Sequence, residues 1–131
     1  MKKLFFILTA SVVLFAYGAK AQTAKILSSS VFSDSLQTHE NCSLLDVRTP
    51  EEFNGGHLKN ATNLDFTNPD FKTNLVKLDK NKSYYVYCHS GKRSSGAATL
   101  MKSLGFKNVY ELQGGIMKWK QDGMQTVKTV E

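Results

Sequence analysis

One cysteine stands where a β-rich run meets a helix, a position in which it can act as a nucleophile. Cys88 follows Tyr84–Tyr87, and the residues that lead from it into the helix are His89, Ser90, Gly91, Lys92, Arg93 and Ser94. A helix N-terminus offers unpaired backbone N–H groups and a positive dipole potential. A short loop with a glycine can also turn its N–H groups inward. These effects, with the charges of Lys92 and Arg93, favour a thiolate and predict a lowered pKa for Cys88.

The same loop can hold an anion against the sulfur, as expected of a cysteine that attacks an oxyanion substrate. The alternative interpretation makes Cys88 a small, inert core residue that ends a strand, since free cysteines are often buried. A polar and basic segment is an unusual continuation of a buried strand. The sequence therefore favours the nucleophile.

Other polar residues suggest less chemistry. His89 adjoins Cys88, but neighbouring side chains diverge and no Asn or Asp is placed to orient its ring, so a Cys–His dyad is unsupported. The three histidines lack metal-ligand spacing, so we expect neither a metal nor another cofactor. Asp46 and Arg48 flank the end of a buried strand. They can support the substrate, although a buried ion pair is the favoured interpretation.

These residues need strands and helices to position them. Buried strands are predicted at Ser43–Val47, Ala61–Leu64, Ser83–Tyr87 and Asn108–Leu112. Thr49, Pro50 and Glu52 predict a capped short helix, and apolar periodicity predicts helices after Asn68–Pro69, over Ser94–Leu104 and after Gly114–Gly115. Val31–Thr38 is assigned a strand end and a short helix capped by Ser33 or Asp34. The two glycines at 114–115 indicate a close backbone approach near the site, and Trp119 is expected in the core.

Alternation of apolar strands with helices predicts an α/β fold, with a small parallel sheet of about five strands flanked by helices on both faces. Ligands of such sheets bind beyond the carboxyl ends of the strands. Cys88 and Asp46 both fall at that end.

The first residues are typical of an export signal. A basic start, an apolar stretch from Leu4 to Gly18 and the small-x-small motif Ala19–Ala21 predict a signal peptide at residues 1–21. The apolar stretch is shorter than the roughly 20 residues that span a bilayer, which disfavours an uncleaved anchor. We therefore expect an exported protein, periplasmic or secreted, without stable membrane insertion. It would comprise an exposed lead-in at 22–30, a domain at 31–123 and a tail at 124–131.

The composition argues against several classes of protein. The 131 residues suit one domain, and 41% hydrophobic and 21% charged residues argue against disorder. The net charge of +6 falls to +3 once the predicted signal removes three of the 17 basic residues. The remaining lysines are scattered without interleaved aromatic residues, so nucleic acid is not an expected partner.

From about Val31 to Gln121 the chain resembles a single-domain rhodanese, a sulfurtransferase. The matching blocks are Leu44–Arg48, Glu51–Phe53, Gly56–Leu58 with Ala61 and Asn63, Tyr85–Cys88, Ser90–Gly91, Arg93–Ser94, Leu104–Phe106, Asn108–Val109, and Gly114–Ile116 with Trp119. The resemblance implies that the Cys88 thiolate takes the outer sulfur of thiosulfate or a persulfide. The N–H groups of residues 89–94 would cradle that sulfur. Cyanide, a thiol or a dithiol, for instance on a thioredoxin-like protein, would then remove it.

Two other functions remain open. Cysteine phosphatases of a similar fold have one more residue in this loop than the four between Cys88 and Arg93, so the short loop favours sulfur over phosphate. An arsenate-type reductase would need a resolving cysteine. A non-catalytic module that binds sulfide or persulfide is the stronger alternative. Many relatives have Arg in place of His89 and a small residue in place of Lys92, a difference that bears on substrate preference.

Cys42 is the other cysteine, and it precedes a strand whereas Cys88 follows one. In parallel strands these positions lie at opposite edges, about five residues at ~3.3 Å each apart. A disulfide tolerates a Cα separation of about 7 Å. We therefore predict no Cys42–Cys88 bridge.

Overall fold

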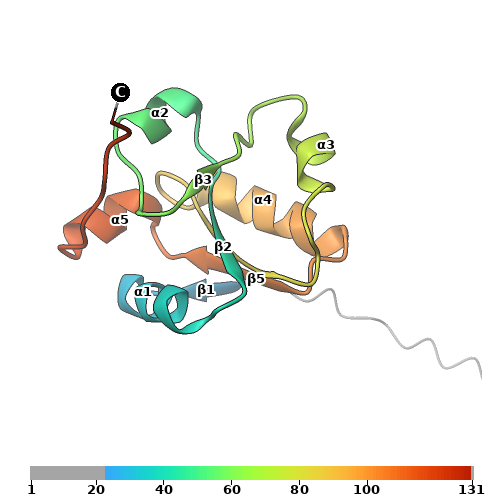
Figure 1. Ribbon diagram of the computed structural model, residues 1–131, viewed down its shortest axis with the longest axis horizontal. Coiled ribbons are helices and arrows are strands. Elements are labelled where there is room, and N and C mark those ends of the chain that lie inside the picture. The colour runs from blue at the N-terminus through green and yellow to red at the C-terminus, as the bar shows by residue number, and fades with distance from the viewer. Residues whose placement is uncertain (1–22, 131) are drawn as a thin grey trace, which may run out of the picture.

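Five parallel strands form a single sheet in the order β1-β5-β4-β2-β3 in the computed structural model, which describes residues 23–130 (Figure 1). The strands are β1 (Lys25–Leu27), β2 (Cys42–Asp46), β3 (Thr62–Asn63), β4 (Ser83–Tyr87) and β5 (Asn108–Leu112). The predicted parallel α/β fold is confirmed. β4 lies at the centre of the sheet, and so the residue that follows it emerges in the middle of the carboxyl edge.

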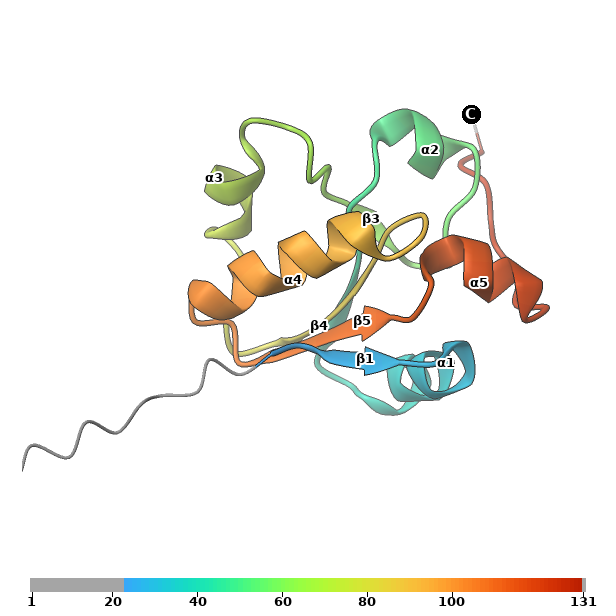
Figure 2. The ribbon, with the colours of Figure 1, turned by 180° about the vertical axis from the view of Figure 1, so that it is seen from behind.

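Within residues 23–130, five helices lie between or after the strands and cover the sheet. They are α1 (Ser29–Thr38), α2 (Pro50–Asn54), α3 (Phe71–Leu75), α4 (Lys92–Ser103) and α5 (Gly115–Gln121). Figure 2 shows α4 above the sheet and α1 below it. The predicted helices on both faces are therefore present.

Alternating side chains of β4 divide the core between the two faces of the sheet. Tyr84, Val86 and Cys88 pack on the face covered by α3 and α4, with Met101 among their neighbours. Tyr85 and Tyr87 point the other way, into a cluster with Phe32, Leu112, Ile116 and Trp119 from α1, β5 and α5. This period of two is the ordinary geometry of a strand. It aims the Cys88 side chain toward α4, and Trp119 lies in the core as expected.

The predicted caps of the central helices are partly confirmed. Thr49 Oγ1 accepts a hydrogen bond from Glu52 N at 3.3 Å and Glu52 Oε2 accepts one from Thr49 N at 3.0 Å, which is the predicted capping box. α4 begins at Lys92, two residues before the predicted start. Gly91 caps it with φ 108°, a left-handed conformation that favours glycine.

The N-terminal prediction needs a correction. Residues 25–27, assigned to a lead-in, form strand β1, which pairs with β5. Three residues at a sheet edge, two of them exposed, carry too little apolar pattern to be recognised in the sequence. α1 begins at Ser29 and is capped by Ser28, whose Oγ accepts a hydrogen bond from Val31 N, and not by Ser33 or Asp34. The helix thus includes two residues of the supposed lead-in.

The segment predicted as a C-terminal tail packs against the domain. Val127 and His57 exchange backbone hydrogen bonds of 2.8 Å in both directions. Trp119 Nε1 donates to the Gln125 carbonyl at 2.9 Å. A buried indole N–H needs an acceptor, so Gln125 gives this segment a structural role. Among residues 23–130, no helix is long and apolar enough to cross a bilayer.

Candidate active site

Cys88 lies at the carboxyl end of β4, beneath the turn that leads into α4. Only 1% of its surface is exposed, whereas His89, Ser90 and Lys92 are exposed. The sulfur is thus held within the protein while the loop above it faces solvent. Such a site excludes most of the water around the sulfur.

Hydrogen bonds converge on the sulfur. Gly91 N donates to Cys88 Sγ at 3.1 Å, and the Cys88 thiol donates to Ser94 Oγ at 3.4 Å. Once the thiol has lost its proton, the Ser94 hydroxyl can donate to the sulfur in turn. Burial by itself raises the pKa of Cys88, but the Ser94 hydroxyl and the backbone N–H groups of Ser94, Gly91 and Ser90 outweigh it. The pKa is therefore below its ordinary value, in the direction that the sequence predicted. The turn is a nest of donors for a thiolate or for a sulfur atom attached to it.

The N-terminus of α5 holds this loop from behind. Ile116 N donates to the Cys88 carbonyl at 2.9 Å, and Met117 N donates to the His89 carbonyl at 3.0 Å. A Cβ on Gly115 would lie 2.4 Å from the His89 oxygen, and Gly115 has φ +62°. Only glycine permits this approach, so the close backbone contact predicted for the two glycines is confirmed at Gly115.

The guanidinium of Arg93 is paired with Glu52. Its Nη1 and Nη2 donate to the two carboxylate oxygens of Glu52 at 2.7 and 2.8 Å. The bidentate pair lowers the pKa of Glu52 to about 2, assisted by the hydrogen bonds from Thr49. Glu52 had been explained as a helix cap alone. Its carboxylate joins α2 to the active loop, which the sequence could not reveal because the partners are 41 residues apart.

Asp46 and Arg48 form the buried ion pair that the sequence favoured. Arg48 Nη2 lies 2.7 Å from Asp46 Oδ2 and also donates to the Gly56 carbonyl at 2.7 Å. Both side chains are almost wholly buried. The guanidinium is occupied by these acceptors, and so the pair braces the turn between β2 and α2. Its geometry supports a structural role more than contact with a substrate.

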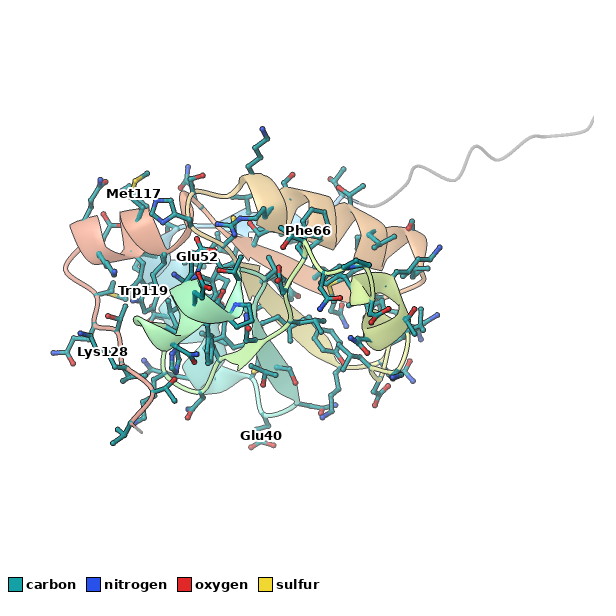
Figure 3. The ribbon with its side chains drawn as sticks, turned by 90° about the horizontal axis from the view of Figure 1, so that it is seen from above. Glu40, Glu52, Phe66, Met117, Trp119 and Lys128 are labelled. Carbon is teal, nitrogen blue, oxygen red and sulfur yellow. The ribbon has the colours of Figure 1, made fainter. Side chains whose placement is uncertain are left out.

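Three side chains border the loop, as Figure 3 shows for Glu52, Phe66 and Met117 around the start of α4. Glu52 reaches it through Arg93. The Phe66 ring lies against Gly96 of α4, where an added Cβ would be 2.8 Å from Cζ. Met117 is 43% exposed and follows the residue that braces the Cys88 carbonyl. An ion pair and two apolar side chains thus lie around the N-terminal end of α4.

The sequence predicted that Cys88, the segment 89–94 and the two glycines at 114–115 lie together, and the structure brings them together. It did not predict the other residues near the start of α4. Lys92, Arg93 and Ser94, which the sequence assigned to the loop, lie in the first turn of α4. Among residues 23–130, no three His, Cys, Asp or Glu side chains are grouped to hold a metal ion. Phe66 and Met117 had no sequence signal, since their relation to Cys88 depends on how α4 and α5 pack.

The sequence matches the rhodanese-like domain family over residues 30–122, and the chain belongs to that family. It is 36% identical over 92 residues to thiosulfate sulfurtransferase 16, chloroplastic, of Arabidopsis thaliana, covering 63% of this chain and 77% of the relative. The solution structure of the polysulfide-sulfur transferase homodimer from Wolinella succinogenes superimposes with a TM-score of 0.68 at 27% identity. That match covers 82% of this chain and 81% of the other.

Several relatives are matched over only part of their length. The tRNA uridine(34) hydroxylase of Pelagibacter ubique is 40% identical over 77 residues, which are 58% of this chain and only 26% of the hydroxylase. The first three curated relatives are matched over 63%, 47% and 49% of their lengths. The domain is therefore shared among proteins that carry different additional segments.

Proposed function

We propose that this protein is a sulfurtransferase that carries sulfane sulfur as a persulfide on Cys88. The observation that carries the proposal is the set of donors around Cys88 Sγ, with Gly91 N at 3.1 Å and a lowered thiol pKa. A thiolate is the nucleophilic form of cysteine. The same N–H groups can receive a negatively charged outer sulfur without further rearrangement.

The reaction has two displacement steps. The Cys88 thiolate attacks the outer sulfur of thiosulfate, a new S–S bond forms, and the old S–S bond breaks with its electron pair leaving on sulfite. Cyanide or a thiolate then attacks the outer sulfur of the Cys88 persulfide, giving thiocyanate or a new persulfide and returning the Cys88 thiolate. No external oxidant or reductant enters, and the two half-reactions predict ping-pong kinetics.

The natural donor is proposed to be a small sulfur anion, and the natural acceptor a thiol or dithiol. Exposed Lys92 and His89 beside the loop suit an anionic donor. The relatives named for thiosulfate and polysulfide sulfur transfer support the same chemistry. Met117, which follows Ile116 behind the loop and is 43% exposed, is an apolar surface that an acceptor larger than cyanide can contact.

The test is thiosulfate:cyanide sulfur transfer by the wild-type protein and by Cys88→Ser, followed as thiocyanate formation. We expect turnover in the wild type and none above background in the variant. Cys42→Ser is the matched control and should retain full activity. Equal rates in the wild type and Cys88→Ser would remove Cys88 from the mechanism, while a binding module would show no turnover with any sulfur donor.

We also propose that the protein acts after export, with cleavage following Ala21. The support is the sequence pattern of residues 1–21, which lie outside the described residues. An oxidising compartment threatens an activated thiolate, and a resting persulfide would protect it. N-terminal sequencing of the protein recovered from a host with signal peptidase should begin at Gln22. An intact Met1 would contradict export by this route.

A further inference from the structure

A second candidate site lies beside α4, on the face of the sheet that α4 covers, along the edge strand β1. A groove of about 890 Å³ runs between α4 and β1, with Ala24, Ile26 and Glu111 on its floor and Ser95 and Thr99 on its wall. β1 is the end of the sheet (Figure 2), and α4 packs on β4 and β5. Ile26 is 65% exposed as a result, although it shares a face with the buried core.

Glu111 is the unusual residue of this groove. It is only 7% exposed, and within the described residues its carboxylate has no hydrogen bond or ion pair. Burial raises its pKa above the ordinary glutamate value. An unpaired carboxylate does not stabilise a fold, and buried carboxylates are normally paired. Ser29 Oγ is the one buried polar side-chain atom without a partner in residues 23–130, so the Glu111 oxygens are open to the groove, where a ligand can pair with them.

The neighbours of Glu111 define the chemistry of that ligand. Ile26 is its direct partner in the register of β1 and β5, so an apolar surface lies about 4.8 Å away across the strands. Thr99 Oγ1 donates to the Ser95 carbonyl at 2.9 Å, which leaves lone pairs of its oxygen to accept a hydrogen bond. A carboxylate, a hydroxyl oxygen and an aliphatic surface together suit an ammonium group on a hydrocarbon stem.

The lysines of the groove lie at its other end. Lys107 precedes β5, four residues or about 13 Å from Glu111 along the strand. Lys102 Nζ donates to the Lys107 carbonyl at 2.9 Å. The Lys102 ammonium thus lies at the amino end of β5, whereas Glu111 lies near its carboxyl end beside Ile26.

We propose that this groove binds a small organic cation, whose primary ammonium pairs with Glu111 and whose apolar stem lies over Ala24 and Ile26. The volume fits a small molecule. An added peptide strand is disfavoured because β1 has only three residues to pair with. The proposal is independent of sulfur transfer, since α4 separates the groove from the Cys88 loop at its N-terminus.

The test is a titration of the full chain with n-hexylammonium, followed by ¹H–¹⁵N NMR, with 1-hexanol as the neutral probe. We expect saturable shifts at residues 26, 99 and 111 and at least about tenfold tighter binding of the ammonium, the effect of a charge-assisted hydrogen bond. Glu111→Gln should remove that preference. Glu40→Gln, which changes an exposed carboxylate on the far side of the molecule (Figure 3), should keep it.

A second variant tests the proposal in case Glu111→Gln does not fold. Ile26→Lys places a tethered ammonium beside Glu111, and we expect it to raise the melting temperature and abolish binding of n-hexylammonium. Absence of binding by the wild type, equal affinity for both probes, or unchanged preference in Glu111→Gln would overturn the proposal. Loss of thiocyanate formation in Cys88→Ser affects none of these outcomes, so the two proposals fail separately.

Discussion

The sulfur of Cys88 is activated mainly by hydrogen bonds, and the two basic side chains of its loop contribute less than their sequence positions suggested. Ser94 Oγ and Gly91 N lie within bonding distance of Cys88 Sγ, whereas Arg93 is paired with Glu52. Hydrogen bonds to a charged group are stronger than those between neutral groups. The chemistry of the site therefore depends on how the turn is folded.

Ser94→Ala should raise the pKa of Cys88, because the hydroxyl that stabilises the thiolate is lost. The thiolate is present above the pKa and disappears as pH falls through it, so the midpoint of the alkylation rate against pH should move upward. At neutral pH we expect about tenfold slower alkylation of Cys88 by iodoacetamide, the value of one such hydrogen bond. Ser95→Ala, the exposed neighbour, is the control. An unchanged midpoint in Ser94→Ala would contradict this account.

Glu52→Gln should remove a stabilising contribution that depends on pH. The folded-state pKa of about 2 lies below the ordinary value of 4.5, so the carboxylate stabilises the fold above pH 4.5 and this stabilisation is lost as pH falls toward 2. At neutral pH we expect the variant to be about 1 kcal/mol less stable. Urea unfolding at several pH values measures this gap, the difference in the free energy of unfolding between the wild type and Glu52→Gln. The gap should close in acid, and a constant gap would show that the carboxylate charge is irrelevant.

At the scale of elements, the active loop is set by α2 and α5 as much as by β4 and α4. α5 donates backbone hydrogen bonds to the carbonyls of Cys88 and His89, and α2 is connected through Glu52. Gly115 makes the first of these contacts possible. A substitution that displaces either short helix should therefore alter the position of the loop around the Cys88 sulfur.

Gly115→Ala should be strongly destabilising. Its Cβ would lie 2.4 Å from backbone oxygen, and its φ of +62° is unfavourable for alanine, so we expect a loss of about 3 kcal/mol. Gly123→Ala is the matched control, with φ +79° and nothing within 4 Å, and should cost about 1 kcal/mol. Thermal unfolding of both variants measures the difference. Equal losses would mean that the approach of α5 to the loop is not tight.

At the scale of the whole molecule, the features that depend on neighbouring residues in the sequence were predicted. The features that depend on tertiary packing were not. The capping box of Thr49 and Glu52 and the turn at Gly115 have local signals, and the structure contains both. The pairing of Glu52 with Arg93 joins residues that are remote in the chain. β1 escaped prediction because a three-residue edge strand depends on β5 for its definition.

The separation of the two cysteines is also a property of the whole sheet. Both thiols are free, and Cys42 pairs in register with Ser83, which lies five residues before Cys88. About 16 Å of strand separates them. Mild oxidation of the folded protein should therefore give no intramolecular bridge by intact mass and peptide mapping. A linked Cys42–Cys88 peptide from folded monomer would contradict the strand arrangement.

Persulfide formation is the central claim, and mass spectrometry of the protein after exposure to thiosulfate tests it most directly. The account predicts a gain of one sulfur atom on the peptide that contains Cys88, its removal by cyanide with release of thiocyanate, and no gain on Cys42 or in Cys88→Ser. If Cys88 stays unmodified with thiosulfate and with polysulfide, or if the sulfur is found on Cys42, the account is contradicted.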